Sequence, residues 1–364
     1  MINRVTNTTS PVVRYNKRMR IQRDVSLAKH STMRLGGNAD YLVNIKEKSD
    51  IPNALDWAAE KKLPTVMIGG GSNIIWKDSG FKGLVMVNKI PGFEISELDS
   101  DTVYVKVGAG ENWDKTVERT VKKGLQGIEG LSLIPGTAGG APVQNIGAYG
   151  QDVSQTLVSV EVYDTKTQQF VSLVNEECHF GYRTSRFKYK DKGRFYICSL
   201  TFALARKSPE PPFYDSLQRY IDQIGITEYT PASIREIVIA IRSSRLPDPA
   251  KVANNGSFFA NPIISESRFK VLKDKYPSIP GWPVVGSTNR KRVKVPAGWL
   301  IEQAGFKGFH DRKTGMATWH AQALVLVNEK AESTADLLIF RNRIIDEIKD
   351  KFGITLEQEP EILP

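Results

Sequence analysis

Apolar residues in the first ninety positions recur with two spacings, one typical of strands and one typical of a helix. Residues 39–46 and 64–73 contain short apolar runs that predict strands, and a further run spans 83–90. Residues 49–62 have helical spacing, with Pro52 in the first turn, where proline is tolerated. These runs predict a strand–helix–strand unit with a glycine-rich turn between its last two strands.

The middle of the chain changes to strict alternation. Val103, Val105 and Val107 alternate with other residues as in a half-buried strand, and a helix over 112–123 should end at Gly124. Further patterns predict a hairpin at 157–173, a strand at 194–205 and, after a proline-rich stretch at 207–215, a helix at 233–245.

The last third opens with residues 246–262, whose proline, asparagine and glycine content is typical of a linker to a new domain. Beyond it we expect a helix at 296–305, a strand at 322–328, a long amphipathic helix at 333–352 and a strand-like tail at 354–363. Strands and helices are mixed without regular βαβ repetition, which favours the α+β class.

Length and composition fit a soluble globular protein of two or three domains. The chain has 364 residues, of which 40% are hydrophobic and 25% charged. It contains no apolar run of about 18 residues, so no membrane insertion is expected. The basic N-terminal stretch lacks the apolar region of a secretory signal, which predicts a cytoplasmic location.

The net charge of +10 is spread along the chain. A nucleic-acid binder would concentrate that charge with aromatic residues, so no nucleic-acid partner is expected. A spread positive field suits small anionic ligands, and plain solubility explains any single lysine equally well. Cys178 and Cys198 form no CxxC motif and the four histidines are scattered, so we expect no metal site.

Two glycine-rich segments, IGGGSNIIW at 68–76 and IPGTAGGAPVQNIGAYG at 134–150, are the strongest local signal. Glycine allows close approach of the main chain, and successive free N–H groups bind anions. Neither segment has the GxGxxG or GxxxxGK[ST] pattern, so Rossmann and P-loop sites are excluded. Two such loops suggest a long ligand with phosphate in its middle, such as FAD, while Gln144 and Asn145 could bind a heterocycle or ribose. The alternative is two tight turns without a ligand.

The order of several motifs resembles the UDP-N-acetylenolpyruvoylglucosamine reductase family, flavoenzymes of peptidoglycan synthesis. The motifs run from about Ser31 to Glu361 and are STMRLGGNADYLV, IGGGSNIIW, GLSLIPGTAGGAPVQNIGAYGQDV, HFGYRTSRFK, RSSRLPDP, NNGSFFANP, PAGWLIEQAGFKG, WHAQALVLVN and EPEI. The insertion near Tyr214 resembles the longer-loop branch of the family.

The resemblance implies an α+β fold in which a two-part FAD-binding domain of the vanillyl-alcohol-oxidase/PCMH type precedes an α+β substrate-binding domain. It divides the chain into a first FAD subdomain at 1–91, a second at 92–247 and a substrate domain at 248–355, with the tail 356–364 returning to the first. FAD would be non-covalent, since neither glycine-rich segment contains His or Cys. The implied FAD-binding residues are Gly70, Gly71, Ser72, Asn73, Gly136, Thr137, Asn145, Gly147 and Arg242.

The same resemblance implies reduction of a UDP-sugar enolpyruvyl ether by NADPH through the flavin. We expect a monomer, a state that the sequence itself does not determine. Arg183 would stabilise the substrate carboxylate, Ser257 would donate a proton, and Glu361 would complete the catalytic trio. Tyr182, Tyr214, Arg245, Asn261 and Gln322 would bind the UDP-sugar.

Residue chemistry alone leaves alternatives. Arg186 and Lys188 are as plausible as Arg183, and Glu359 lies near Glu361. A related flavin oxidase and a catalytically idle nucleotide-binding protein are the competing functions. The C-terminal motifs argue against the oxidase, and the presence of all three trio residues argues against the idle protein.

Overall fold

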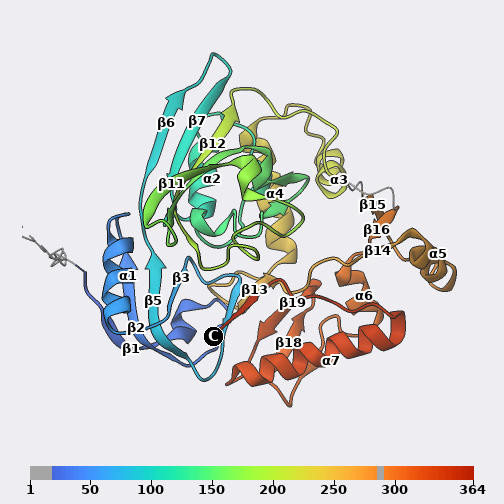
Figure 1. The fold of residues 1–364 in the computed structure, drawn as a ribbon. Coiled ribbons are helices and arrows are strands. Elements are labelled where there is room, and N and C mark those ends of the chain that lie inside the picture. Colours follow the sequence, from blue (N-terminus) through green and yellow to red (C-terminus); the bar gives the residue numbers. More distant parts are fainter. Residues whose placement is uncertain (1–18, 285–290) are drawn as a thin grey trace, which may run out of the picture.

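The computed structural model describes residues 19–284 and 291–364. Three bodies of secondary structure follow one another along the chain, in blue to cyan, cyan to yellow, and orange to red in Figure 1. Most of the basic N-terminal stretch lies outside the described residues. Within the described ranges, no helix combines the length and the apolar character needed to cross a membrane.

The first body is a four-stranded sheet in the order β1-β2-β5-β3. Its strands are β1 Gln22–Ser26, β2 Asn38–Ile45, β5 Phe81–Asn88 and β3 Thr65–Ile68, with β1 antiparallel to β2 and the other pairs parallel. Helix α1, Asp50–Glu60, buries Ile51, Ala54 and Ala58. The predicted strand–helix–strand unit is confirmed, and a short extra strand, β4 Ile74–Trp76, follows the first glycine-rich segment.

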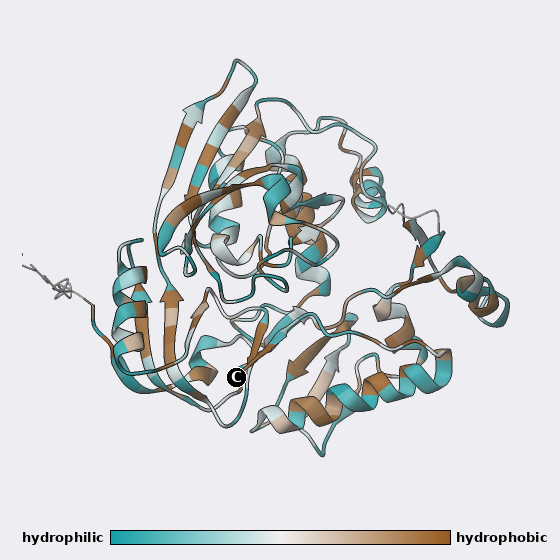
Figure 2. Cartoon of the chain, in the orientation of Figure 1, coloured by the Kyte–Doolittle hydropathy of each residue, from teal (hydrophilic) through white to brown (hydrophobic). Residues whose placement is uncertain are grey.

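The second body is a five-stranded antiparallel sheet in the order β11-β10-β12-β7-β6. Its strands are β6 Phe93–Glu97, β7 Thr102–Gly108, β10 Leu157–Asp164, β11 Gln169–Val174 and β12 Phe195–Ala205. Val103, Val105 and Val107 are all 0% exposed, as the alternation predicts. In Figure 2 the same alternation appears as brown and pale bands along these strands.

Helices and one small hairpin complete this second body. They are α2 Trp113–Val121, α3 Asp215–Ile224, α4 Pro231–Arg245, β8 Gly147–Ala148 and β9 Gln151–Asp152. Gly124 follows α2 with a φ of 70°, the conformation expected for a residue that ends a helix. Helix α3 was not predicted, because the proline-rich stretch before it hid its short apolar face of Leu217 and Ile221.

The third body pairs a four-stranded antiparallel sheet with a long helix. The sheet order is β13-β19-β18-β17, with strands Ala253–Ser257, Gln322–Asn328, Met316–Trp319 and His310–Asp311. Helix α7, Thr334–Phe352, is capped by Ser333, ends at Gly353, and buries Leu337, Phe340, Ile344, Ile348 and Phe352. The predicted helix near residue 296 is α6, Ala297–Gln303. A peripheral sheet of β14 Ile263–Ser265, β16 Arg292–Lys294 and β15 Trp282–Val284 carries α5, Glu266–Lys275.

The interpretation of 246–262 as a linker is wrong for its second half. Residues from Ala253 form β13, and Phe258 and Phe259 are 0% exposed in the core of the third body. The side chain of Asn254 hydrogen-bonds to nearby backbone, and Gly256 has a φ of 70° where the strand pairing is interrupted. Turn-forming residues therefore serve an irregular strand here.

The tail joins the third body to the first. Its only strand, β20 Glu361–Leu363, pairs in parallel with β4. Just before it, an isolated bridge joins Phe259 to Gln358. In Figure 1 the red tail accordingly runs between the sheet of β13 and the blue sheet.

Candidate active site

A cavity of about 680 Å³ lies between the three bodies and is walled by both glycine-rich segments, α4 and the tail. The two segments touch at this wall, since a Cβ atom placed on Gly70 would lie 2.9 Å from the Cα atom of Gly136. Only glycine allows two backbones to approach so closely, which explains one glycine in each segment.

The first segment presents free backbone donors. Within the described chain, no N–H group of residues 69–73 donates a hydrogen bond. Gly71 has a φ of 71°, and a Cβ atom there would collide with the carbonyl oxygen of His30. Consecutive free N–H groups in a turn form a nest for phosphate oxygens, so this segment fits the pyrophosphate of FAD.

The second segment adds open backbone and an unpaired donor. A Cβ atom on Gly140 would meet nothing within 4 Å, so this part of the wall is open. The hydroxyl of Thr137 is buried without a partner among the described residues, as is Nε of Arg242 on α4. Burial lowers the pKa of the Arg242 guanidinium, whose Nη2 donates to the carbonyl of Leu133 at 3.3 Å. A partly buried cation in the wall of the same cavity suits an anionic ligand, which again fits FAD.

All but one of the residues predicted to bind FAD line this cavity. The exception is Asn145, which is 4% exposed and has a φ of 48°. Its side-chain Oδ1 accepts from the Ser154 N–H at 2.9 Å, and its Nδ2 donates to the Gly181 carbonyl at 3.3 Å. Asn145 thus holds the shape of the loop, and its neighbour Gln144 lines the cavity, while binding of FAD by Asn145 stays a prediction.

Arg183 occupies the tip of a tight turn at the cavity wall. The turn is closed by hydrogen bonds between Gly181 and Thr184, and Arg183 has a φ of 54°, which is uncommon for a residue with a side chain. Its Nη2 donates to the Gly147 carbonyl at 2.7 Å, and its Nε lies 3.4 Å from a carboxylate oxygen of Glu359. Of its two competitors, Arg186 pairs with Asp191 at 2.8 Å and does not line the cavity, whereas Lys188 does.

Ser257 and Glu361 reach the same cavity from different elements. Ser257 ends β13, is exposed, and its hydroxyl makes no hydrogen bond within the described chain. Glu361 begins β20, where its N–H donates to the Asn73 carbonyl at 3.0 Å and its carboxylate pairs with Lys192. The structure therefore brings the predicted trio to one cavity.

Lys188 and Gln144 are cavity residues to which the sequence assigned no firm role. Nζ of Lys188 lies 3.4 Å from Oε1 of Gln144 and 3.4 Å from the Arg183 carbonyl. That same Oε1 accepts from Nδ2 of Asn73 at 2.7 Å. Burial lowers the pKa of Lys188, while nearby glutamates oppose the change. A lysine five residues after Arg183 was visible in the sequence, but its burial was not.

The residues predicted to bind the UDP-sugar do not line the 680 Å³ cavity. Tyr182 is 41% exposed and Tyr214 is 49% exposed, so both rings are available at the surface. Arg245 is exposed at the end of α4. Asn261 and Gln322 lie near α6: Asn261 accepts from the Ala297 N–H at 2.9 Å, and the Gln322 side chain lies close to Gly298.

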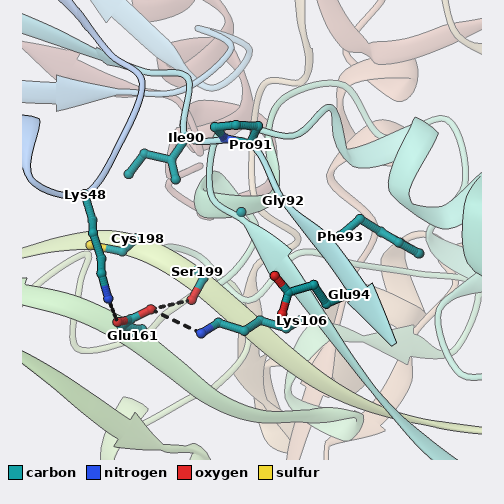
Figure 3. Close-up of a pocket in the computed structure, with 11 residues that line it drawn as sticks. Lys48, Ile90, Pro91, Gly92, Phe93, Glu94, Lys106, Glu161, Cys198 and Ser199 are labelled. Carbon is teal, nitrogen blue, oxygen red and sulfur yellow. Dashed lines mark hydrogen bonds and ion pairs between the residues drawn. The ribbon is translucent and has the colours of Figure 1, made fainter. Parts of the chain in front are cut away.

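A second, smaller cavity of about 180 Å³ lies where the first and second bodies meet (Figure 3). The carboxylate of Glu161 pairs there with Lys48 at 2.7 Å and Lys106 at 3.5 Å, and accepts from Ser199 at 2.9 Å. Burial would raise the pKa of Glu161, but these hydrogen bonds and charges hold it below its ordinary value. Both lysines are already paired, so we interpret this cavity as a structural junction.

Comparison with known proteins matches both halves of this arrangement. Residues 39–171 match the FAD binding domain family, and residues 248–363 match the C-terminal domain of UDP-N-acetylenolpyruvoylglucosamine reductase. The reductase of that name from Cupriavidus pinatubonensis is 40% identical over 337 residues, covering 93% of this chain and 97% of the relative. That from Alcanivorax borkumensis is 42% identical over 302 residues, covering 83% and 84%.

A solved structure is similar over nearly the whole chain. The UDP-N-acetylenolpyruvylglucosamine reductase of Thermus caldophilus is 21% identical and has a TM-score of 0.64, covering 95% of this chain and all of its own. At that identity the likeness concerns the fold. The predicted α+β class, with an FAD-binding domain before a substrate-binding domain, is confirmed. By the identity and coverage of its relatives, the chain belongs to the UDP-N-acetylenolpyruvoylglucosamine reductase family.

Proposed function

We propose that this flavoenzyme reduces UDP-N-acetylglucosamine enolpyruvate to UDP-N-acetylmuramate in peptidoglycan synthesis, with NADPH as the reductant. Family membership supports the reaction class. The observation that carries the proposal to this chain is the meeting of Arg183, Ser257 and Glu361 at one cavity beside the free N–H groups of residues 69–73. We also propose the three-domain division at residues 91, 247 and 355, since each body has its own sheet.

The glycine-rich segments and Arg242 would hold FAD, which would supply the hydride chemistry between NADPH and the enolpyruvyl group. The residues of the cavity then have two tasks. They must stabilise the negative charge that develops next to the substrate carboxylate, and they must deliver a proton.

Arg183 suits the first task, because a guanidinium fork matches a carboxylate that becomes an enediolate. Its Nη1 makes no hydrogen bond within the described chain, while Nη2 and Nε are held by Gly147 and Glu359. Ser257 suits the second task, because its exposed hydroxyl is free to donate to a strongly basic carbon. Glu361 lies beside them with Lys192 as its partner, and we assign it to positioning the substrate or the proton.

The test separates the two half-reactions by the absorbance of the flavin. In an anaerobic rapid-mixing experiment, NADPH should bleach the visible band and the enolpyruvyl substrate should restore it. Ser257→Ala should leave bleaching unchanged and slow the recovery by about a hundredfold or more, the scale of lost proton donation.

Ser267→Ala is the matched control, because Ser267 is exposed on α5 and its hydroxyl has, among the described residues, only the hydroxyl of Ser265 as a hydrogen-bond partner, at 3.0 Å. It should behave as the wild type in both half-reactions. Recovery at the wild-type rate in Ser257→Ala would remove Ser257 from the proton-donating role. A wild-type flavin that NADPH bleaches and the substrate fails to restore would refute the proposed reaction itself.

A further inference from the structure

Glu359 lines the cavity and is held by its backbone on both sides. Its N–H donates to the Phe258 carbonyl at 2.9 Å, directly after Ser257 in the chain. On the other side, its carbonyl accepts from Nδ2 of Asn73, in the first glycine-rich segment, at 3.3 Å. The position of this residue is therefore fixed by the third and first bodies together.

The side chain of Glu359 points to the second body. Its carboxylate lies 3.4 Å from Nε of Arg183, and the residue is only 8% exposed. Arg183 has a second anchor, the Gly147 carbonyl at 2.7 Å. The two anchors engage Nε and Nη2, which fixes the plane of the guanidinium and leaves Nη1 without a partner in the described chain.

Burying a carboxylate with a single arginine as its partner costs stability, because both groups lose their solvation. Burial raises the pKa of Glu359, and the charges of Arg183 and Lys188 oppose that rise. An apolar side chain would avoid the cost of burying this charge, so the charge itself needs a reason.

We propose that Glu359 is a positioning residue that orients the Arg183 guanidinium toward the substrate carboxylate. Glu361 keeps its own place in the trio, and Glu359 acts through Arg183 without contacting the reacting atoms. This inference rests on the proposed function, and it extends that function by one residue.

Double-mutant kinetics test the coupling. Glu359→Gln keeps the shape and removes the charge. It should leave flavin bleaching by NADPH unchanged and slow reoxidation by the enolpyruvyl substrate at least tenfold. In an Arg183→Ala background the same change should slow reoxidation less than twofold further, because the group that it orients is already missing.

Glu357→Gln is the matched control, since Glu357 is exposed two residues earlier on the same tail. It should not change either half-reaction. If Glu359→Gln does not fold, Glu359→Asp replaces it, because the shorter side chain keeps the charge and loses the reach. The same non-additivity with Arg183→Ala is expected.

The pH dependence of the reoxidation rate, and in particular its fall at low pH (the acid limb), provides a readout that a merely structural role would not change. The groups that face Glu359 are Arg183, Lys188 and Tyr182. Because burial raises its pKa, Glu359 becomes protonated and loses its charge at a higher pH than an ordinary glutamate does. The wild type should therefore show an acid limb that Glu359→Gln lacks.

Equal slowing by Glu359→Gln in the wild-type and Arg183→Ala backgrounds would overturn the inference, as would unchanged reoxidation or identical acid limbs. These outcomes leave the proposed function intact. That function fails separately, if the wild-type flavin is not bleached by NADPH or not restored by the substrate.

Discussion

Removing the carboxylate of Asp114 should weaken both the fold and the binding of FAD. Asp114 lies in the first turn of α2, and its two oxygens accept from Nη1 and Nη2 of Arg235 on α4 at 2.7 and 3.0 Å. It also accepts from the N–H of Leu133 at 2.6 Å. Leu133 has a φ of 59°, and its carbonyl accepts from Arg242, so it fixes the entry to the second glycine-rich segment.

The magnitude follows from the burial of the pair. The side chain of Arg235 is 10% exposed and that of Asp114 is 29% exposed. Breaking a fully buried pair costs roughly 3–5 kcal/mol, while exposed pairs contribute at most about 1 kcal/mol. For Asp114→Ala we therefore expect a loss of about 2–3 kcal/mol in the free energy of unfolding. Asp114→Asn keeps an acceptor for Leu133 and should lose about 1–2 kcal/mol.

Urea unfolding followed by circular dichroism gives the stabilities, and titration of apoprotein with FAD gives the affinities. Arg235→Met completes a double-mutant cycle, in which a coupling of about 1.5 kcal/mol is expected. The FAD dissociation constant should rise more in Asp114→Ala than in Asp114→Asn, because only the former releases Leu133. Asp274→Ala, an exposed site on α5, is the control. Stabilities within about 0.5 kcal/mol of the wild type, or a cycle without coupling, would refute the reasoning.

Gly71→Ala should lose bound FAD and stability, because Gly71 has a positive φ and is closely packed against backbone. Gly124 also has a positive φ but has open space around it, so Gly124→Ala should lower the free energy of unfolding by only about 1 kcal/mol. Equal losses of bound flavin in the two variants would contradict a role for close packing at Gly71. Asp164→Asn should be less stable than the wild type above about pH 4, because two hydrogen bonds from Arg194 hold the pKa of Asp164 at about 2. The stability from this pair is lost as the pH falls from about 4 to about 2, so the free energies of unfolding of the two proteins should converge over that range. A difference between them that does not change with pH would exclude the Asp164–Arg194 pair as its source.

The local sequence pattern predicted those elements of the fold that depend on interactions between residues close together in the sequence. The alternating valines of β7 and the Ser333 and Gly353 ends of α7 match the structure because burial and capping act over a few residues. The order β1-β2-β5-β3 and the pairing of β20 with β4 depend on contacts across tens to hundreds of residues. No periodicity in the sequence encodes those contacts.

The site divides in the same way. Glycine content alone indicated the two cavity walls, because close backbone approach demands that residue. It could not distinguish Gln144, which lines the cavity, from Asn145, which holds the loop. The burial of Glu359 was equally hidden, since a glutamate in a polar tail is ordinarily solvated.

The three side chains of the proposed trio come from elements that are far apart in the sequence, and the segment 357–363 brings these elements together. Its residues 357–359 pair with residues 258–260, directly after the strand of Ser257, and Glu361–Leu363 pair with β4, while Glu359 reaches Arg183. The segment therefore contacts the residues after Ser257 at one end and β4 at the other. Loosening its backbone would separate the proton donor from the arginine and would also release Asn73, whose carbonyl accepts from the Glu361 N–H. Side-chain changes that keep this backbone pairing, such as Glu359→Gln, should therefore leave FAD binding and its reduction by NADPH intact while they slow the transfer to substrate.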